Sequence, residues 1–186
     1  SYLCLYAKSN GLNPLIIHFD NGWNSEIAQK NIELIVNELE FDLYTHVVDW
    51  DEFKIMQRAY INSSVVDVEV LTDHAFMSLL FQQAKKWNIK YVLAGTNIKT
   101  ESILPSYWVF SKRDKINLVD IINKNGEKKF KSLKSYPSCT PERRLFYDKF
   151  LDIEFVEPLN FINYDTEEAK TELYDKLGWK KYGGKH

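Results

Sequence analysis

The sequence of 186 residues has few glycines, prolines and cysteines, and each shortage excludes a class of protein. Seven Gly and five Pro exclude collagen-like and low-complexity chains. Two cysteines, Cys4 and Cys139, supply neither a disulfide framework nor the four ligands of a structural zinc site. No apolar run approaches the roughly 18 residues of a membrane-spanning helix, and the first residues lack the pattern of a signal peptide. We therefore expect a cytoplasmic protein without a membrane partner.

The residues that are present are typical of a globular chain whose charge is unevenly distributed. Hydrophobic residues make up 45% of the sequence, and 5 Trp, 11 Tyr and 11 Phe supply large rings for a core or for binding sites. The net charge is −2, yet residues 112–144 hold ten Lys and Arg against four Asp and Glu. This basic segment, 112–144, is either a solvated face or a surface for an anionic ligand, such as a phosphorylated metabolite or nucleic acid.

Hydrophobic periodicity and capping residues predict that helices and strands alternate over residues 1–95. The expected strands are 14–20, 42–48 and 89–94. The expected helices cover 2–10 and three segments capped by Asn24 or Ser25, by Asp49 with Glu52, and by Thr72. Later elements are a short helix at 115–123 and a helix that begins at Asp165 with Glu168 and ends at Gly178.

Short connections between alternating strands and helices favour a parallel sheet with helices on both faces. We therefore predict an α/β fold with a doubly wound, Rossmann-like parallel sheet in residues 1–104. Residues 105–186 are predicted to form a less regular, basic C-terminal region that packs on this core. The helix predicted at the first residues also suggests that the sequence is part of a longer chain.

In doubly wound sheets, ligands bind beyond the carboxyl ends of the strands, and this rule selects residues 18–23, Asp49 and residues 95–101. Each motif also has an ordinary structural interpretation. Asp20-Asn21-Gly22 is a common turn, and Thr72-Asp73-His74 could simply open a helix. Glu101 is a single carboxylate in an expected loop. Trp23 and Trp108 are core residues by default and sugar-stacking residues otherwise.

Taken in order, these motifs resemble a known family. They are His18-Phe19-Asp20-Asn21-Gly22-Trp23-Asn24, Thr72-Asp73-His74, Gly95-Thr96-Asn97-Ile98 with Glu101, Leu177-Gly178-Trp179 and Tyr182-Gly183-Gly184-Lys185-His186. The series is similar to the N-acetyl sugar amidotransferases of bacterial surface-polysaccharide biosynthesis, including that of lipopolysaccharide O-antigen. That family belongs to the PP-loop ATP pyrophosphatase superfamily, so the resemblance implies a sheet of the PP-loop ATPase type.

Two features of the family are not in this sequence. Family members carry an N-terminal strand and a Ser-Gly-Gly-x-Asp-Ser loop that grips the pyrophosphate of ATP, and Ser1-Tyr2-Leu3 resembles the residues that follow this loop. They also usually carry upstream cysteines that look zinc-binding, so Zn²⁺ is expected only in a region outside this sequence. A chain that truly lacked the loop would more simply be a non-catalytic nucleotide- or partner-binding module.

The resemblance implies an ATP-dependent conversion of an acetamido group on a nucleotide sugar into an acetamidino group, with Mg²⁺ as the metal. It places Ser1, His18, Phe19, Asp20, Gly95, Thr96 and Asn97 at the nucleotide. Glu101 would bind Mg²⁺, for which oxygen ligands are suitable. Asp73, His74 and Lys185 would act at the acetamido group, and the basic segment would hold the diphosphate of the sugar nucleotide.

The resemblance also implies a partner, because nothing in the sequence looks like a glutaminase. A separate class I glutaminase subunit would supply the ammonia. Another PP-loop enzyme is the alternative within the superfamily, including one that thiolates tRNA. A thiolating enzyme usually needs catalytic cysteines, for which Cys4 and Cys139 are poorly placed. We therefore expect a nucleotide-sugar substrate and no nucleic-acid partner.

Overall fold

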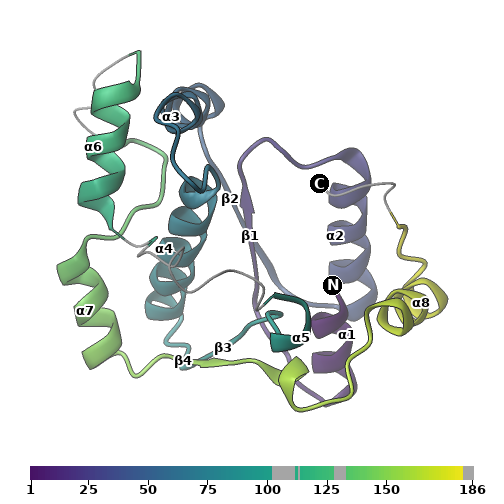
Figure 1. Ribbon diagram of the computed structural model, residues 1–186. Coiled ribbons are helices and arrows are strands. Elements are labelled where there is room, and N and C mark those ends of the chain that lie inside the picture. The colour runs from purple at the N-terminus through teal and green to yellow at the C-terminus, as the bar shows by residue number, and fades with distance from the viewer. Residues whose placement is uncertain (102–111, 113, 128–132, 182–186) are drawn as a thin grey trace.

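The computed structural model describes residues 1–101, 112, 114–127 and 133–181, and they form a mixed α/β fold (Figure 1). The α/β class predicted from the sequence is confirmed. The elements in chain order are α1 Tyr2–Ser9, β1 Ile16–Asp20, α2 Glu26–Leu39, β2 Leu43–Val47, α3 Trp50–Asn62, α4 Val70–Lys86, β3 Tyr91–Leu93, α5 Ile98–Glu101, α6 Lys115–Asn125, α7 Pro141–Phe150, β4 Glu154–Val156, the 3-10 turn η2 Pro158–Asn160 and α8 Thr166–Leu177.

Within these described residues, the strands pair as two parallel two-stranded sheets, and a single doubly wound sheet is not shown. Strand β1 pairs with β2, from Ile16 opposite Leu43 to Asp20 opposite Val47. Strand β3 pairs with β4 in the same parallel sense. Because β4 lies in the region predicted to be a C-terminal extension, that region contributes a strand to the α/β fold.

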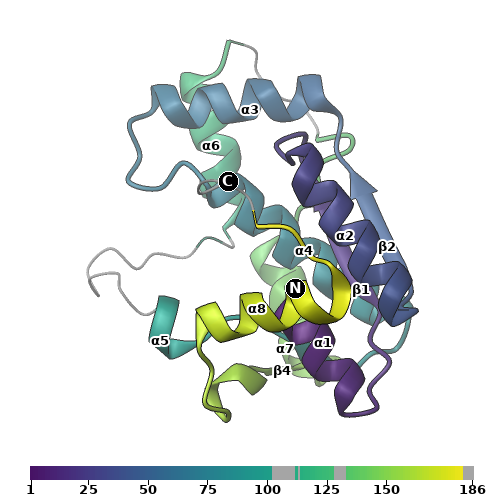
Figure 2. The ribbon, with the colours of Figure 1, turned by 90° about the vertical axis from the view of Figure 1, so that its right-hand side faces the viewer.

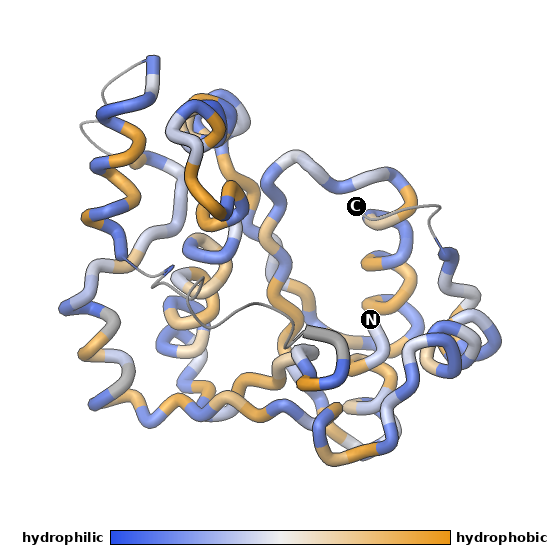
Figure 3. The backbone as a smooth tube through the Cα atoms, in the orientation of Figure 1, coloured by the Kyte–Doolittle hydropathy of each residue, from blue (hydrophilic) through white to orange (hydrophobic). Residues whose placement is uncertain are grey.

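Alternation along β1 directs its side chains into two different cores. Ile17 and Phe19 pack into a core shared with α3, α4 and α6, whereas Ile16 packs against a core built from α1, α2 and α8. Figures 1 and 2 show α2 on one side of the β1–β2 pair and α3 and α4 on the other. In Figure 3, hydrophobic residues follow β1 and β2, while α8 is largely hydrophilic.

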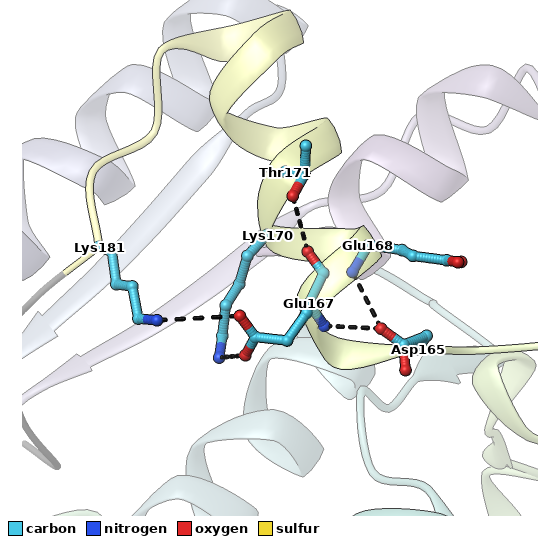
Figure 4. Close-up of polar contacts among 6 residues, drawn as sticks. All are labelled: Asp165, Glu167, Glu168, Lys170, Thr171 and Lys181. Carbon is cyan, nitrogen blue, oxygen red and sulfur yellow. Dashed lines mark hydrogen bonds and ion pairs between the residues drawn. The ribbon is translucent and has the colours of Figure 1, made fainter.

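Several predicted helix ends are confirmed by hydrogen bonds. Ser25, rather than Asn24, caps α2 by accepting from the Ala28 N–H at 3.2 Å. Asp49 caps α3, and Asp165 caps α8 by accepting from the N–H groups of Glu167 and Glu168, as Figure 4 shows. Gly178 ends α8 with a φ of 70°, which glycine adopts without strain.

Two capping predictions are wrong in an informative way. Helix α4 begins at Val70, so Thr72 lies inside its first turn and its hydroxyl is available for another contact. Glu52 does not return to the backbone of Asp49 to complete a capping box. Its carboxylate instead accepts from the backbone N–H groups of Lys134 and Ser135, more than eighty residues away. The local pattern predicted the helix start correctly but not the partner of Glu52.

The sequence analysis missed α7 and β4. Helix α7 has a recognisable start, because Thr140 accepts from the Arg143 N–H and Pro141 is the first helical residue. Strand β4 has only three residues, too few to show a period. None of the helices in the described ranges combines the length and apolarity needed to span a bilayer.

Candidate functional site

The carboxyl end of β1 carries a compact group of polar side chains. The amide nitrogen of Asn24 lies 3.2 Å from His18 Nε2 and 3.5 Å from Asp20 Oδ1. Asp20 Oδ1 also accepts from the Gly22 N–H at 3.0 Å. His18 and Asp20 thus share a contact with Asn24, at the end of a parallel strand where ligands of α/β proteins bind.

Phe19 differs from its two neighbours because it points to the opposite face of β1. Its side chain is buried in the core and lies 6.2 Å from the His46 ring and 6.3 Å from the Phe53 ring, measured between centroids. A ligand at the end of β1 could therefore meet only the backbone of Phe19 and not its ring.

The loop after β1 contacts the first turn of α4. Asn21 Nδ2 donates to the hydroxyl of Thr72 at 3.1 Å. This contact joins residues 51 positions apart and places Thr72-Asp73-His74 beside the His18–Asn24 group. Two of the segments selected from the sequence therefore meet in space.

His74 is buried, with a relative exposure of 1%, and both of its ring nitrogens have backbone partners. The Cys139 N–H donates to Nε2 at 3.3 Å, so Nδ1 carries the proton and donates to the Lys112 carbonyl at 3.0 Å. Burial lowers the pKa of His74, which favours this neutral form. In this arrangement the ring links two loops, and it could act on a substrate only if one of these bonds opened.

Asp73 is more exposed and takes part in an ion-pair group with Lys112 and Asp67. The Lys112 ammonium lies 2.6 Å from Asp73 Oδ2 and 2.7 Å from Asp67 Oδ2. Burial by itself would raise the pKa of Asp67, but hydrogen bonds from Lys112 and from the Glu69 N–H outweigh it and hold this pKa below its usual range. The group therefore places the Lys112 ammonium between two carboxyl groups.

The predicted Gly95-Thr96-Asn97 segment lies at the carboxyl end of β3. The Thr96 hydroxyl donates to Glu157 Oε1 at 2.6 Å, and Asn160 holds the other Glu157 oxygen at 2.9 Å. Asn97 is buried, and no atom of the described residues lies within 4 Å of the position a Cβ on Gly95 would take. This leaves room for a ligand beside the Gly95 backbone, as a phosphate site would need.

Glu157 and Asn160 were not selected from the sequence, although they fix this loop. Both follow β4, which the sequence analysis did not recognise, and Asn160 Oδ1 also accepts from the Ile98 N–H at 2.9 Å. Thr96 hydrogen-bonds to the segment after β4. The polar residues after β1 instead hydrogen-bond within the loop before α2 and, through Asn21, to α4. The structure thus shows two polar groups, one at the carboxyl end of each parallel pair.

Of the remaining predicted residues, only Ser1 has a described side chain, and it belongs to neither group. Ser1 is exposed and makes no side-chain cap for α1. Glu101 ends α5, but its side chain is outside what the structure describes, as are Lys185 and His186. Among the described residues, no three His, Cys, Asp or Glu side chains are grouped to hold a metal ion. The Mg²⁺ role of Glu101 therefore stays a prediction.

The default interpretation of Trp23 as a core residue is wrong, because its relative exposure is 63%. Its ring packs edge-to-face against that of Trp50, with centroids 5.9 Å apart and planes 79° apart. Trp50 is itself 44% exposed and begins α3, just after β2. Trp108 lies outside the described residues.

A surface hollow elsewhere runs along α8, and its lining is mostly acidic: Glu167, Glu168, Thr171, Glu172, Asp175 and Lys176. Part of this charge is already paired, since Glu167 contacts Lys170 at 2.6 Å and Lys181 at 3.8 Å (Figure 4). Surplus carboxylates repel phosphates, so this hollow does not suit a nucleotide.

The site is therefore defined by its own geometry: two parallel strand pairs, each with a polar group at its carboxyl end. No protein-family model and no curated protein sequence matches this chain.

Proposed function

We propose that this chain is an ATP-dependent amidotransferase that converts the acetamido group of a nucleotide sugar into an acetamidino group. One observation carries the proposal: residues 18–24 and 72–74, which the family resemblance selected, meet at the carboxyl end of β1 through Asn21 and Thr72. Ligands bind at this end of parallel strands in α/β proteins. The space that the described residues leave open beside Gly95, at the end of β3, would provide a second point of approach.

The chemistry requires activation because an amide oxygen is a poor leaving group. The acetamido oxygen attacks the α-phosphorus of ATP, and pyrophosphate leaves. Ammonia then adds to the activated carbon, and AMP departs with the oxygen. ATP with Mg²⁺ supplies the leaving groups for these steps.

The chain's own residues would position these groups. Asp20 and His18 would face the nucleoside, and the backbone at Gly95 would face the α-phosphate. Asp73, with 47% of its side chain exposed beside Lys112, is better placed than buried His74 to contact the acetamido group. Lys185 would complete the site from the C-terminal segment.

The proposal includes one doubly wound sheet that contains both strand pairs. In this arrangement a strand preceding α1, with the Ser-Gly-Gly-x-Asp-Ser loop after it, would lie between β1 and β3. The pairing of the strands supports the idea. Among the described residues, β1 pairs only with β2 and β3 only with β4, so β1 and β3 each keep one edge for a further strand.

The proposed partners follow from the reaction. A class I glutaminase subunit would deliver ammonia, and the product would enter a surface polysaccharide. Because ATP and nucleotide sugars are cytoplasmic metabolites, the proposed location is the cytoplasm.

The test is pyrophosphate release by the intact protein with ATP, Mg²⁺, ammonium and a panel of acetamido nucleotide sugars. We expect release that depends on one sugar, and a product in which NH replaces oxygen by mass spectrometry. Asp20→Asn should reduce this rate, whereas Asp42→Asn, exposed before β2 at the opposite end of the sheet, should not. Release that required RNA instead of a sugar, or no release despite ATP binding, would refute the amidotransferase proposal.

A further inference from the structure

Trp23 and Trp50 form an exposed aromatic pair next to the site at the end of β1. Trp23 follows β1 by three residues and Trp50 follows β2 by three residues, so both belong to the carboxyl ends of paired strands. Their edge-to-face contact leaves 63% of Trp23 and 44% of Trp50 accessible. Large aromatic residues that stay accessible at a ligand-binding edge can stack against a planar ring.

The pair is held in place by the loop that carries it. Gly22 has a φ of +79°, and a Cβ at this position would lie only 2.9 Å from Trp50 Cε3, so the Trp50 ring packs directly on the Gly22 backbone. The Trp23 N–H donates to Asn21 Oδ1 at 3.2 Å, and Asn21 in turn donates to Thr72 on α4. The loop and α4 therefore hold the backbone at Trp23, and the contact with Trp50 is what positions its ring.

Polar and acidic residues adjoin the two tryptophans in the sequence. Asn24 follows Trp23, Asp20 ends β1 before it, and Asp49 and Asp51 flank Trp50. Carboxylate and amide oxygens accept hydrogen bonds from the N–H groups of a base or from ribose hydroxyls.

A cationic residue for the phosphate lies on the segment clamped to α3. The backbone N–H groups of Lys134 and Ser135 donate to Glu52, and the Ser135 hydroxyl accepts from the Asp49 N–H at 2.8 Å. These bonds bring exposed Lys134, part of the basic segment, to the first turn of α3, where Trp50 lies. A neutral ring surface and a lysine whose backbone is held at the same helix turn match the two parts of a nucleotide.

We propose that Trp23 and Trp50 form a stacking platform for the base of a nucleotide whose phosphate is directed toward Lys134. The base is either the adenine of ATP or the base of the nucleotide sugar, and the two share the same planar chemistry. This inference rests on the proposed function only for the presence of a nucleotide, because stacking requires no turnover.

The experiment measures binding to the intact protein by calorimetry, with AMP and UMP as separate titrants. N-acetylglucosamine and inorganic phosphate serve as titrants without a base. Trp23→Ala should weaken binding of the stacked nucleotide roughly tenfold, and Trp23→Phe should retain most of the affinity. Trp87→Ala is the matched control, since Trp87 is 56% exposed at the end of α4 and should leave binding unchanged. The nucleotide that responds to Trp23→Ala identifies the source of the base.

Equal affinity of Trp23→Ala and the unmodified protein for both nucleotides would overturn the inference, and so would no measurable binding of either by the folded protein. A change in oligomeric state of Trp23→Ala without a change in nucleotide affinity would show a protein interface instead. Failure of the proposed function gives a different result. Pyrophosphate release would then not depend on an acetamido sugar, whereas Trp23-dependent binding would remain.

Discussion

Asn31 and Lys180, which are 149 residues apart, form a reciprocal pair of hydrogen bonds between one side-chain amide and one backbone unit. Asn31 Nδ2 donates to the Lys180 carbonyl at 2.8 Å, and the Lys180 N–H donates to Asn31 Oδ1 at 3.0 Å. Asn31 is 4% exposed in the middle of α2, a position that asparagine does not favour for helix formation. Its amide thus fixes the segment after α8 against α2.

Replacing Asn31 with alanine should lower the free energy of unfolding by about 1–2 kcal/mol, because both hydrogen bonds are lost. Chemical denaturation measures the change. Asn37→Ala, on the exposed side of the same helix, is the matched control and should change stability by less than about 0.5 kcal/mol. Equal stabilities of the two variants would show that the hydrogen bonds between Asn31 and Lys180 do not contribute to the stability of the fold.

Glu52 should be among the most sensitive positions outside the hydrophobic core. Its carboxylate accepts three hydrogen bonds, from the backbone N–H groups of Lys134 and Ser135 and from the Ser135 hydroxyl at 2.6 Å. Glu52→Ala should destabilise the protein by about 2–3 kcal/mol, since bonds to a charged group are stronger than neutral ones. Asp51→Ala, exposed one residue earlier, should have little effect in the same denaturation assay.

His74 should make stability depend on pH. The unfolded chain binds a proton at this residue below about pH 6.5, whereas burial lowers the pKa of His74 in the folded protein. The contribution is complete above the unfolded pKa and is lost as the pH falls toward the folded pKa, at up to about 1.4 kcal/mol per pH unit. Urea unfolding across this range measures the slope.

The His74→Asn variant is the comparison for this slope, because it keeps a donor near the Lys112 carbonyl but has no titrating ring. All other histidines are the same in both proteins, so the difference in slope reports His74 alone. Identical slopes in the two proteins would contradict the assignment of a buried neutral ring.

Gly22 should tolerate substitution less well than Gly11, although both have positive φ values, of 79° and 71°. A Cβ at Gly11 would meet nothing within 4 Å, so Gly11→Ala should cost about 1 kcal/mol from backbone strain alone. Gly22→Ala should cost about 2–3 kcal/mol because Trp50 must also move. Thermal unfolding and the tryptophan emission spectrum together measure both effects. Equal costs would show that Trp50 adapts freely.

Gly95 should behave in the opposite way, as a residue that matters for binding and not for folding. No neighbour in the described part of the chain would contact an added Cβ, so Gly95→Ala should change stability by less than about 0.5 kcal/mol. Gly95→Val should nevertheless weaken ATP binding, because its methyl groups occupy the space that a phosphate would approach. Calorimetric titration with ATP is the measurement, and an unaltered affinity would remove Gly95 from the site.

Some residues of the candidate site could be predicted from the sequence because their signal is local, and others could not because their partners are distant in the chain. Asp20 and Gly95 were found because a strand followed by a polar turn is a local signal. The role of Glu52 was misassigned because its partners lie more than eighty residues away, and Glu157 was missed because three-residue β4 shows no period. For His74, the sequence predicted a role at the substrate, whereas the fold gave both ring nitrogens backbone partners.

The sequence by itself determined the α/β class, the helices capped by Asp49 and Asp165, and the polar segments that follow β1 and β3. These features follow from the periodicity of hydrophobic residues and from helix-capping residues, which lie within a few positions of one another in the chain. Only the tertiary structure decided that Asn21 reaches Thr72, that Phe19 turns into the core while Trp23 stays exposed, and that Lys112 lies between two carboxylates. Those outcomes depend on which segments, far apart in the sequence, pack together and exclude water. Local sequence patterns do not determine that packing.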